Sequence, residues 1–292
     1  MSSSRPDAAS PSLPLPEGVR LGPAHGVPAV HVDIPAASAV VLLDGAHVIS
    51  YAPAGEADLL WMSPTSAFGD GQPARGGIPV VGPWFGPGRE LAQPVKHGWL
   101  RNVRWDLASV ERVGEEVVLA LTTPEEARAL SATLTVRIGT ELAVDLTVTA
   151  GERRLELEAA LHSYLAVEDV REIEIRGLEG AAFLDNTRNL AADVLPAQPL
   201  RLTGSTDRIV DAVGPVTLVD APAGRRIVGT ARGTSRTVVW NPWDALVTGM
   251  DDIPDAAWPE FVCIEPAIAK DGFVALEPGQ SHSLGVTYRV ER

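Results

Sequence analysis

The stretch "ATLTVRIGTELAVDLTVTAG", residues 132–151, decides the fold class of this chain. Runs rich in Val, Leu and Thr flank Gly139-Thr140, where we predict a turn between two strands. Further β-rich runs meet at Asp44-Gly45, a dipeptide that favours tight hairpins, and at Gly114. From Val27 onward, short runs of Val, Ile, Leu and Thr are separated by Gly, Pro and Asp. Many short strands at this spacing predict an all-β fold, a large antiparallel β-sandwich.

The first residues of the chain differ in composition from the rest. Residues 1–18 are rich in Ser, Pro and Ala, and we expect them to be disordered. No proline-rich linker divides the remaining residues, and large β-sandwiches reach this length as one unit. We therefore predict a single domain over residues 19–292.

The charge of the chain limits its partners. It has 292 residues and a net charge of −14, from 24 Lys and Arg against 38 Asp and Glu. This acidic excess argues against nucleic acid or an anionic membrane as a partner. Cys263 is the only cysteine, so no intrachain disulfide can form. The start lacks the apolar core of a signal peptide, and no apolar run is long enough for a membrane span, so we expect a cytoplasmic protein.

His162 is the first candidate for chemistry. In "LELEAALHSYL", residues 155–165, the alternation places the leucines at 155, 157 and 161 on one face and His162 with Tyr164 on the other. Periodicity alone leaves two interpretations open. His162 is either a solvated or hydrogen-bonded strand histidine, or it lines a ligand site where imidazole exchanges protons near neutral pH.

Glu265 is the second candidate. In "EFVCIEPAI", residues 260–268, an apolar strand closes with this carboxylate and is followed by Pro266, and Phe261, Cys263 and Glu265 share one face. Apolar neighbours desolvate a carboxylate, which raises its pKa and its strength as a base. The alternative is a glutamate at a strand end that pairs with a surface arginine.

Three basic residues lie beside glycine-rich segments. Arg75 belongs to "ARGGIPVVGPWFGPG", residues 74–88, and Lys96 and Arg101 belong to "VKHGWLRNVRW", residues 95–105. In an acidic protein, such a group of cations suits a phosphate, because guanidinium groups match phosphate oxygens. Scattered surface charge is the alternative.

Further residue patterns define the remaining candidates and exclude some cofactors. Asp207, in "STDRIVDA", can accept hydrogen bonds from hydroxyl groups. The glycines fit neither a P-loop nor a dinucleotide-binding fingerprint, and no nucleophile elbow occurs. The six histidines form no pair with metal-ligand spacing, so we expect neither a metal nor a cofactor. Nothing in the sequence activates Cys263 as a nucleophile, and we expect it to be a packing residue.

Six segments, taken together, resemble a known family. The chain is similar to the glucose-6-phosphate 1-epimerases, which are hexose-6-phosphate mutarotases within the aldose 1-epimerase superfamily. The matching segments occur in the family's order: "RGGIPVVGPWFG" (75–86), "HGWLRNVRW" (97–105), "LHSYLAVEDVREIEIRGLEG" (161–180), "TDRIV" (206–210), "VVWNPW" (238–243) and "FVCIEPA" (261–267). The resemblance implies a β-sandwich of the galactose mutarotase type, with a concave face that binds a sugar.

The resemblance also implies roles for individual residues. His162 and Glu265 fall on the family's catalytic histidine and glutamate. The substrate-binding residues that it implies are Arg75, Arg101 and Asp207, with His97 as a neighbour of the site. Lys96 stands where some relatives have glutamine, and a lysine there can still meet a phosphate. Val210 replaces the usual tyrosine after "DRI".

The implied activity is a cofactor-independent interconversion of the α and β anomers of a hexose 6-phosphate, by acid–base opening and closure of the ring. Glucose 6-phosphate is the expected substrate, and we expect a monomer. Two alternatives stay open: an aldose 1-epimerase that acts on unphosphorylated sugars, and a non-catalytic carbohydrate-binding sandwich. The grouped cations argue against the first alternative, and the acid–base pair argues against the second.

Overall fold

The computed structural model describes residues 13–69, 71–125 and 130–292. Most of the predicted disordered segment, residues 1–18, lies outside the described residues, and the first strand begins at Val19. Almost all regular structure is antiparallel β-sheet, so the predicted fold class is confirmed. The only α-helix among the described residues is α1 (Trp243–Val247). The described 3₁₀ turns are η1 (Leu100–Asn102), η2 (Asn186–Arg188), η3 (Trp258–Glu260) and η4 (Lys270–Gly272).

One layer of the molecule is an eight-stranded sheet. Its strands, in spatial order, are β13 (Glu174–Arg176), β17 (Val216–Asp220), β18 (Arg225–Arg232), β22 (Ser281–Glu291), β9 (Leu142–Ala150), β8 (Leu130–Ile138), β7 (Glu116–Thr122) and β6 (Asp106–Val113). The hairpins predicted at Gly139-Thr140 and at Gly114 join β8 to β9 and β6 to β7. Local turn chemistry therefore determines this part of the fold.

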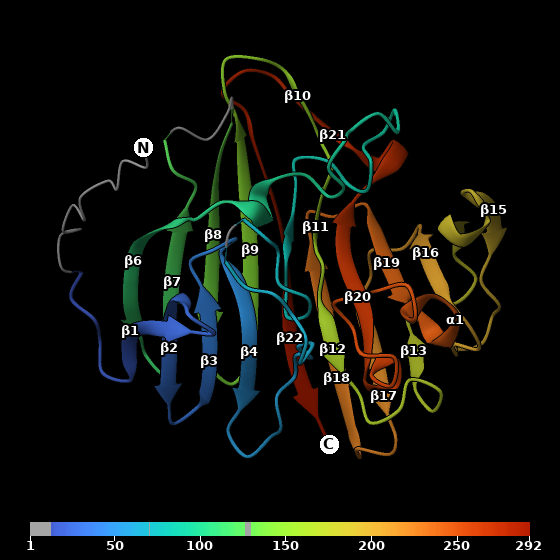
Figure 1. Ribbon diagram of the computed structural model, residues 1–292, viewed down its shortest axis with the longest axis horizontal. Coiled ribbons are helices and arrows are strands. Elements are labelled where there is room, and N and C mark those ends of the chain that lie inside the picture. The colour runs from blue at the N-terminus through green and yellow to red at the C-terminus, as the bar shows by residue number, and fades with distance from the viewer. Residues whose placement is uncertain (1–12, 70, 126–129) are drawn as a thin grey trace.

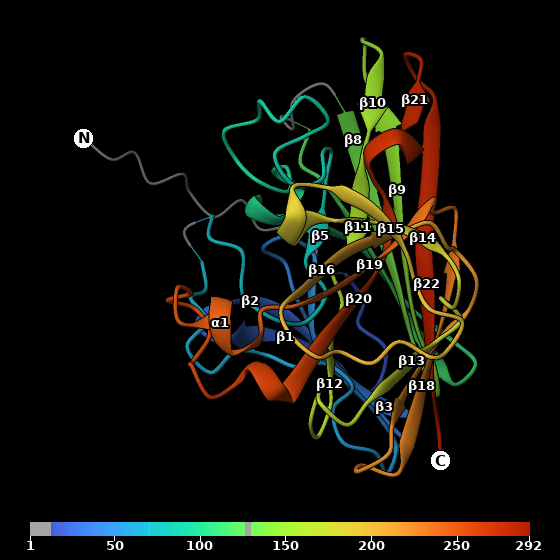
Figure 2. The same cartoon turned by 90° about the vertical axis from the view of Figure 1, so that its right-hand side faces the viewer.

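Two further sheets lie side by side and cover one face of that layer (Figures 1 and 2). The first contains β1 (Val19–Ala24), β2 (Val27–Ile34), β3 (Ala37–Leu42) and β4 (His47–Pro53), and its β3–β4 hairpin turns at the predicted Asp44-Gly45. The second runs in the order β15 (Ala191–Val194), β14 (Ala182–Asp185), β16 (Thr206–Val210), β19 (Arg236–Asn241), β20 (Phe261–Ile268), β11 (Ala159–Leu161) and β5 (Val80–Val81). β12 (Tyr164–Ala166) also pairs with β20, and β10 (Leu155–Leu157) forms a separate ladder with β21 (Val274–Leu276).

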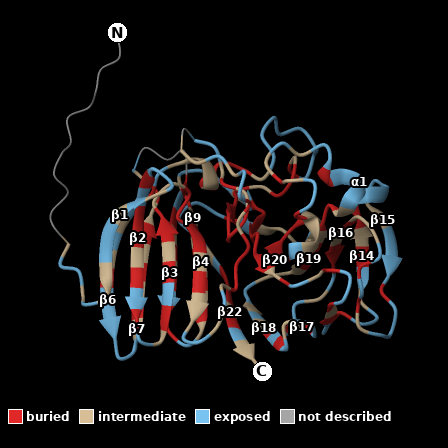
Figure 3. Ribbon diagram, turned by 60° about the horizontal axis from the view of Figure 1, so that its bottom comes forward, coloured by how far each residue is buried: buried red, intermediate tan, exposed pale blue. Residues whose placement is uncertain are grey.

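The core lies between the layers and follows from strand periodicity. Along β9, Leu142, Val144, Leu146 and Val148 are fully buried, while the residues between them are half-buried. Successive side chains of a strand point to opposite faces, so this alternation turns one face of the sheet into the core. Figure 3 shows a similar banding along β2 and β3, where buried positions are separated by more exposed ones.

The predicted strand over residues 155–165 is interrupted twice. It divides into β10, β11 and β12, with breaks at Glu158 and at His162-Ser163. At the second break, the His162 amide donates a hydrogen bond to Pro79 O, and the Ile264 amide donates to Ser163 O. The break therefore lies beside the middle of β20.

The expected end of the next strand at Glu265 is wrong. β20 continues through Pro266 to Ile268, although proline cannot donate to a ladder. β12 pairs with Phe261 to Cys263 and β11 with Ala267 and Ile268, so Pro266 lies opposite the gap between them. Because no neighbouring strand needs its N–H there, the proline is tolerated inside a central strand.

None of the helices in the described ranges is long and apolar enough to cross a membrane.

Candidate active site

His162 and Glu265 meet where the two broken strands flank β20. Nε2 of His162 lies 3.4 Å from Oε1 of Glu265. Glu265 is 1% exposed and His162 is 8% exposed. The face opposite the leucines therefore lies inside the molecule, and no surface arginine pairs with Glu265 among the described residues. A solvated His162 and a Glu265 paired with a surface arginine are therefore wrong, while a hydrogen-bonded, non-catalytic His162 stays open.

The electrostatics of this pair follow from its burial. Burial raises the pKa of Glu265 well above its ordinary value, the charge of Asp207 adds to the rise, and Arg101 opposes it. Burial lowers the pKa of His162 well below 6.5, and the charges of His97, Arg75 and Arg101 lower it further. Both shifts favour the form in which Glu265 is protonated and His162 is neutral.

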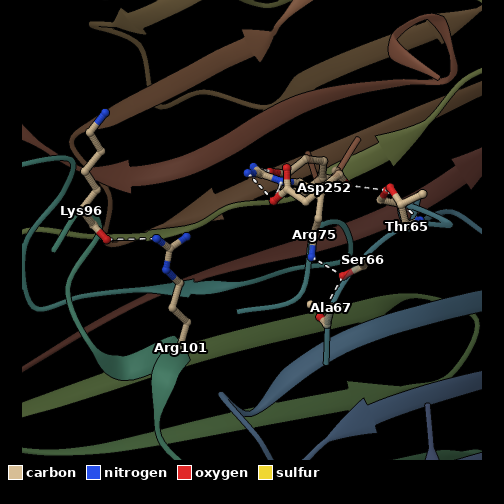
Figure 4. Close-up of polar contacts among 9 residues, drawn as sticks. Thr65, Ser66, Ala67, Arg75, Lys96, Arg101 and Asp252 are labelled. Carbon is tan, nitrogen blue, oxygen red and sulfur yellow. Dashed lines mark hydrogen bonds and ion pairs between the residues drawn. The ribbon is translucent and has the colours of Figure 1, made fainter. Parts of the chain in front are cut away.

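Arg75 lies near the pair and belongs to a hydrogen-bond network that the sequence did not reveal. Its Nη1 donates to the hydroxyl of Tyr164 at 2.8 Å, and its Nε donates to Oδ2 of Asp252 at 2.9 Å. The Tyr164 ring stacks on the imidazole of His162, with centroids 4.8 Å apart and an interplanar angle of 9°. Figure 4 shows Arg75 beside Asp252, so its guanidinium already has two protein partners.

The guanidinium of Arg101 has fewer hydrogen-bond partners in the protein than that of Arg75. Its Nη2 donates to the main-chain oxygen of Lys96 at 2.9 Å (Figure 4), and its buried Nε has no hydrogen-bond partner. Within the described ranges, no carboxylate forms an ion pair with Arg101 or with the exposed side chain of Lys96. This pair of cations is therefore free to meet an anionic ligand.

His97 lies near these cations and near His162. Its ring centroid is 5.9 Å from that of His162, and burial together with the surrounding positive charges lowers the pKa of His97 to about 3. A neutral imidazole at this position can hydrogen-bond a ligand without adding charge.

The glycine-rich segments contact each other and β4. A Cβ on Gly98 would lie 1.9 Å from Gly82 O, and one on Gly77 would lie 2.4 Å from Val48 O. Both residues have positive φ, 68° and 62°. These glycines allow close approach between stretches of the protein's own backbone, and so fix the positions of Arg75 and Arg101.

Asp207, on β16, lies on the other side of Glu265. Its Oδ2 accepts a hydrogen bond from Nδ2 of Asn186 at 2.7 Å. Burial raises the pKa of Asp207, while Asn186 and the charges of Lys270 and Lys96 lower it. All seven residues selected from the sequence thus lie in one region, although Arg75 differs from Arg101 in being fully paired.

Three potential metal-ligand atoms also gather at the site. The donor atoms of His162, Cys263 and Glu265 lie within 4.8 Å of one another. Two effects disfavour a cation there: burial raises the pKa of the Cys263 thiol well above 9, and Arg75 and Arg101 contribute positive charge. The expected absence of a metal stays a prediction.

Four residues at the site were not selected from the sequence: Tyr164, Asn186, Asp252 and Lys270. Tyr164 had a usable signal, because it lies two positions from His162 on the same strand face. Asp252 and Asn186 meet their partners only through long-range contacts, which no local pattern reveals.

Comparisons with known proteins agree with this arrangement. Residues 28–289 match the family model described as aldose 1-epimerase. A protein of Escherichia coli K12 named "Putative glucose-6-phosphate 1-epimerase" is 35% identical over 248 residues, which cover 82% of this chain and 83% of that protein. A protein with the same name from Salmonella typhimurium LT2 is 33% identical over 245 residues, or 82% of each chain.

A solved structure extends the similarity to the fold. The crystal structure described as "a putative mutarotase" from Salmonella typhimurium superposes with a TM-score of 0.88, at 27% identity and 96% coverage of both chains. The match of the family model to most of the sequence, the relatives above 30% identity and the shared sandwich lead to one conclusion: this chain belongs to the aldose 1-epimerase family.

Proposed function

We propose that this protein interconverts the α and β anomers of a hexose 6-phosphate, with glucose 6-phosphate as the substrate. The observation that carries the proposal is the buried pair of His162 and Glu265, 3.4 Å apart, near cations that have no carboxylate partner among the described residues. The names of the relatives, which specify glucose 6-phosphate, support the choice of substrate.

The proposed mechanism needs one base and one acid. Glu265, as carboxylate, removes the proton of the C1 hydroxyl, and a C=O double bond forms at C1 as the C1–O5 bond breaks. His162, as imidazolium, donates its proton to O5. Rotation about C1–C2 presents the other face of the aldehyde, and the ring then closes with both proton transfers reversed. Each such group typically contributes about 10²- to 10⁴-fold to the rate.

Before the first step, the proton that the pair shares must move from Glu265 to His162. Both pKa shifts favour protonated Glu265 and neutral His162, whereas the proposed first step uses the charged form. A phosphate monoester carries a charge of about −1.5 to −2 at neutral pH, which opposes the positive charges that lower the pKa of His162. Substrate binding therefore favours the imidazolium that donates the proton.

The cations are suited to the 6-phosphate. C5, which carries C6, and C1 both flank the ring oxygen, so the phosphate lies on the side of the ring that His162 serves. His97 is the neighbour of His162, and Arg101 and Lys96 lie near His97. The donors of these two cations that have no protein partner suit phosphate oxygens. Arg75, which Tyr164 and Asp252 already hold, acts on His162 through its charge.

Asp207 accepts hydrogen bonds from ring hydroxyls in this proposal, and the effect of its charge on Glu265 supports that role. A cytoplasmic location and a monomeric state stay predictions from the sequence.

The test is an NMR exchange measurement between the anomers of glucose 6-phosphate and, separately, of glucose. Wild type should accelerate exchange of the phosphate ester far more than that of the free sugar. Glu265→Gln and His162→Ala should each lower the rate by about 10²- to 10⁴-fold. Equal rates on both sugars would instead identify an aldose 1-epimerase, and saturable binding without exchange would identify a carbohydrate-binding protein.

A further inference from the structure

The chain contains only two lysines, Lys96 and Lys270, and all its other basic side chains outside the histidines are arginines. The two lysines are distant in sequence, yet the charges of both act on the same two site residues, His97 and Asp207. Lys270 was not selected from the sequence, and the proposed ring-opening mechanism does not use it.

Lys270 is held in an unusual main-chain conformation just after β20. It begins η4 with φ of 59°, a left-handed value that costs free energy for a residue other than glycine. Its amide donates to Oε1 of Glu158 at 2.7 Å. The other oxygen of Glu158 accepts from the amide of Phe85 at 3.3 Å.

Glu158 therefore ties two segments of the site together. It is 1% exposed and lies at the first break in the predicted 155–165 strand, and both its carboxylate oxygens are occupied by main-chain amides. Its position fixes the turn of Lys270 against the glycine-rich segment that carries Phe85. A buried carboxylate with two charge-assisted hydrogen bonds is a rigid support.

The ammonium of Lys270 lies beside the glycine-rich segment at Phe85 and Gly86. Nζ lies 5.9 Å from the centroid of the Phe85 ring, and a Cβ on Gly86 would lie 4.0 Å from it. The Phe85 ring meets His97 edge to face at 5.0 Å, and His97 is the neighbour of His162.

The ammonium also lacks an acidic partner. No carboxylate of the described residues lies within ion-pair distance of Lys270, and the adjacent Asp271 pairs with Arg236 at 2.7 Å. In a protein with a net charge of −14, a cation left unpaired beside two others indicates an anionic ligand.

We propose that Lys270 is a specificity-determining residue that binds the 6-phosphate together with Lys96 and Arg101, and that Glu158 is the positioning residue that directs it there. This inference rests on the proposed function. Lys96 and Arg101 come from one segment of the chain and Lys270 comes from another, so the phosphate would be held from two segments. The compact ammonium of lysine suits this position because it can adjust to a phosphate on a flexible sugar carbon.

The presence of only two lysines allows a direct test by amine labelling. The wild-type protein is treated with limiting acetylating reagent, and the labelling rates of Lys96, Lys270 and the terminal α-amino group are followed by mass spectrometry. Inorganic phosphate and glucose 6-phosphate should each slow labelling of both lysines at least severalfold, while glucose should not. The α-amino group is the internal control. Labelling of Lys270 at the same rate with and without phosphate would overturn the inference.

Variants test the same point through kinetics. Lys270→Met keeps the length of the side chain without its charge, and should lower kcat/KM for glucose 6-phosphate about tenfold more than for glucose, mostly through KM. Lys270→Arg should restore most of the loss. Glu158→Gln should act in the same direction, and should add little when combined with Lys270→Met, because both changes act through one ammonium. Full additivity in the double variant would remove Glu158 from its positioning role.

The outcomes separate this inference from the proposed function. If wild type fails to exchange the anomers of glucose 6-phosphate but phosphate protects Lys270, the proposed reaction is wrong and the anion site stands. If wild type exchanges them and Lys270→Met has the wild-type KM, the reaction stands and the role of Lys270 is wrong.

Discussion

The imidazole Nε2 of His162 lies 3.4 Å from Oε1 of Glu265, while Nδ1 of the histidine and Oε2 of the glutamate are buried without a hydrogen-bond partner in the described structure. A buried polar atom left unpaired costs free energy. The cost persists here on both side chains at once, at the two residues to which the proposed mechanism assigns the proton transfers.

Replacing Glu265 by glutamine should stabilise the fold. A carboxyl whose folded-state pKa is raised is most favourable at low pH, and its contribution is lost as the pH rises from its unfolded pKa toward its folded pKa. Glutamine does not ionise, so Glu265→Gln should melt above wild type at pH 8, by about 2–4 °C for each kcal/mol recovered. The difference should shrink toward pH 4.

Calorimetry or thermal circular dichroism at several pH values checks this. His162→Ala is the control, because it removes activity but keeps the buried carboxyl, and it should show no gain that grows with pH. A constant difference between Glu265→Gln and wild type across this range would show that ionisation of Glu265 does not strain the fold.

Removing the guanidinium of Arg101 should change substrate preference. A hydrogen bond to a charged group contributes about 1.5–3 kcal/mol, so Arg101→Ala should lower kcat/KM for glucose 6-phosphate roughly ten- to hundredfold more than for glucose. Arg104→Ala is the matched control, since Arg104 is exposed and pairs with Asp44 at 2.6 Å. Anomer exchange by NMR on both sugars gives the answer, and equal losses on the two sugars would refute a phosphate contact.

The hydroxyl of Tyr164 should matter for turnover. Tyr164→Phe keeps the ring that stacks on His162 but removes a hydrogen-bond partner of Arg75. The guanidinium of Arg75, whose charge acts on His162, is then held less firmly in position. We expect kcat to fall about three- to tenfold. Tyr288→Phe is the comparison, because that buried hydroxyl donates to Ile264 O, at 3.3 Å, and not to Arg75. If both variants lose kcat equally, the role of Tyr164 is general packing.

Removal of metal should leave the enzyme active. Although His162, Cys263 and Glu265 bring three donor atoms together, the protonated thiol and the neighbouring arginines disfavour a bound cation. Dialysis against a strong chelator should therefore leave the exchange rate of glucose 6-phosphate unchanged. Loss of activity that a divalent ion restores would contradict this and would assign the three residues to a metal centre.

The sequence predicts those parts of the fold that depend on local turn chemistry. Gly139, Gly114 and Gly45 mark real hairpins, and at Gly114 and Gly45 the turn takes a positive φ whichever strands lie beyond it. The passage of β20 through Pro266 was not predictable, because it depends on a gap in strands about a hundred residues earlier in the chain.

The candidate site likewise combines features that local sequence predicts with contacts that only the fold creates. Alternation placed His162 and Tyr164 on one face, but nothing local could show that this face is buried. The pairing of Arg75 with Asp252 and the hydrogen bond from Lys270 to Glu158 are contacts between distant segments. The resemblance to a family identified the region, and the coordinates were needed to distinguish the paired arginine from the free one.

The gap between β11 and β12 places His162 within the sheet instead of on a loop above it. The amides on either side of this gap are bonded to the backbone of neighbouring segments, so the histidine has little freedom to move independently of the core. The proposed reacting groups should therefore keep their positions for as long as the sheet stays folded. On gradual heating, the ability to turn over sugar should persist until the whole sandwich melts, with no earlier stage in which a folded but inactive protein accumulates.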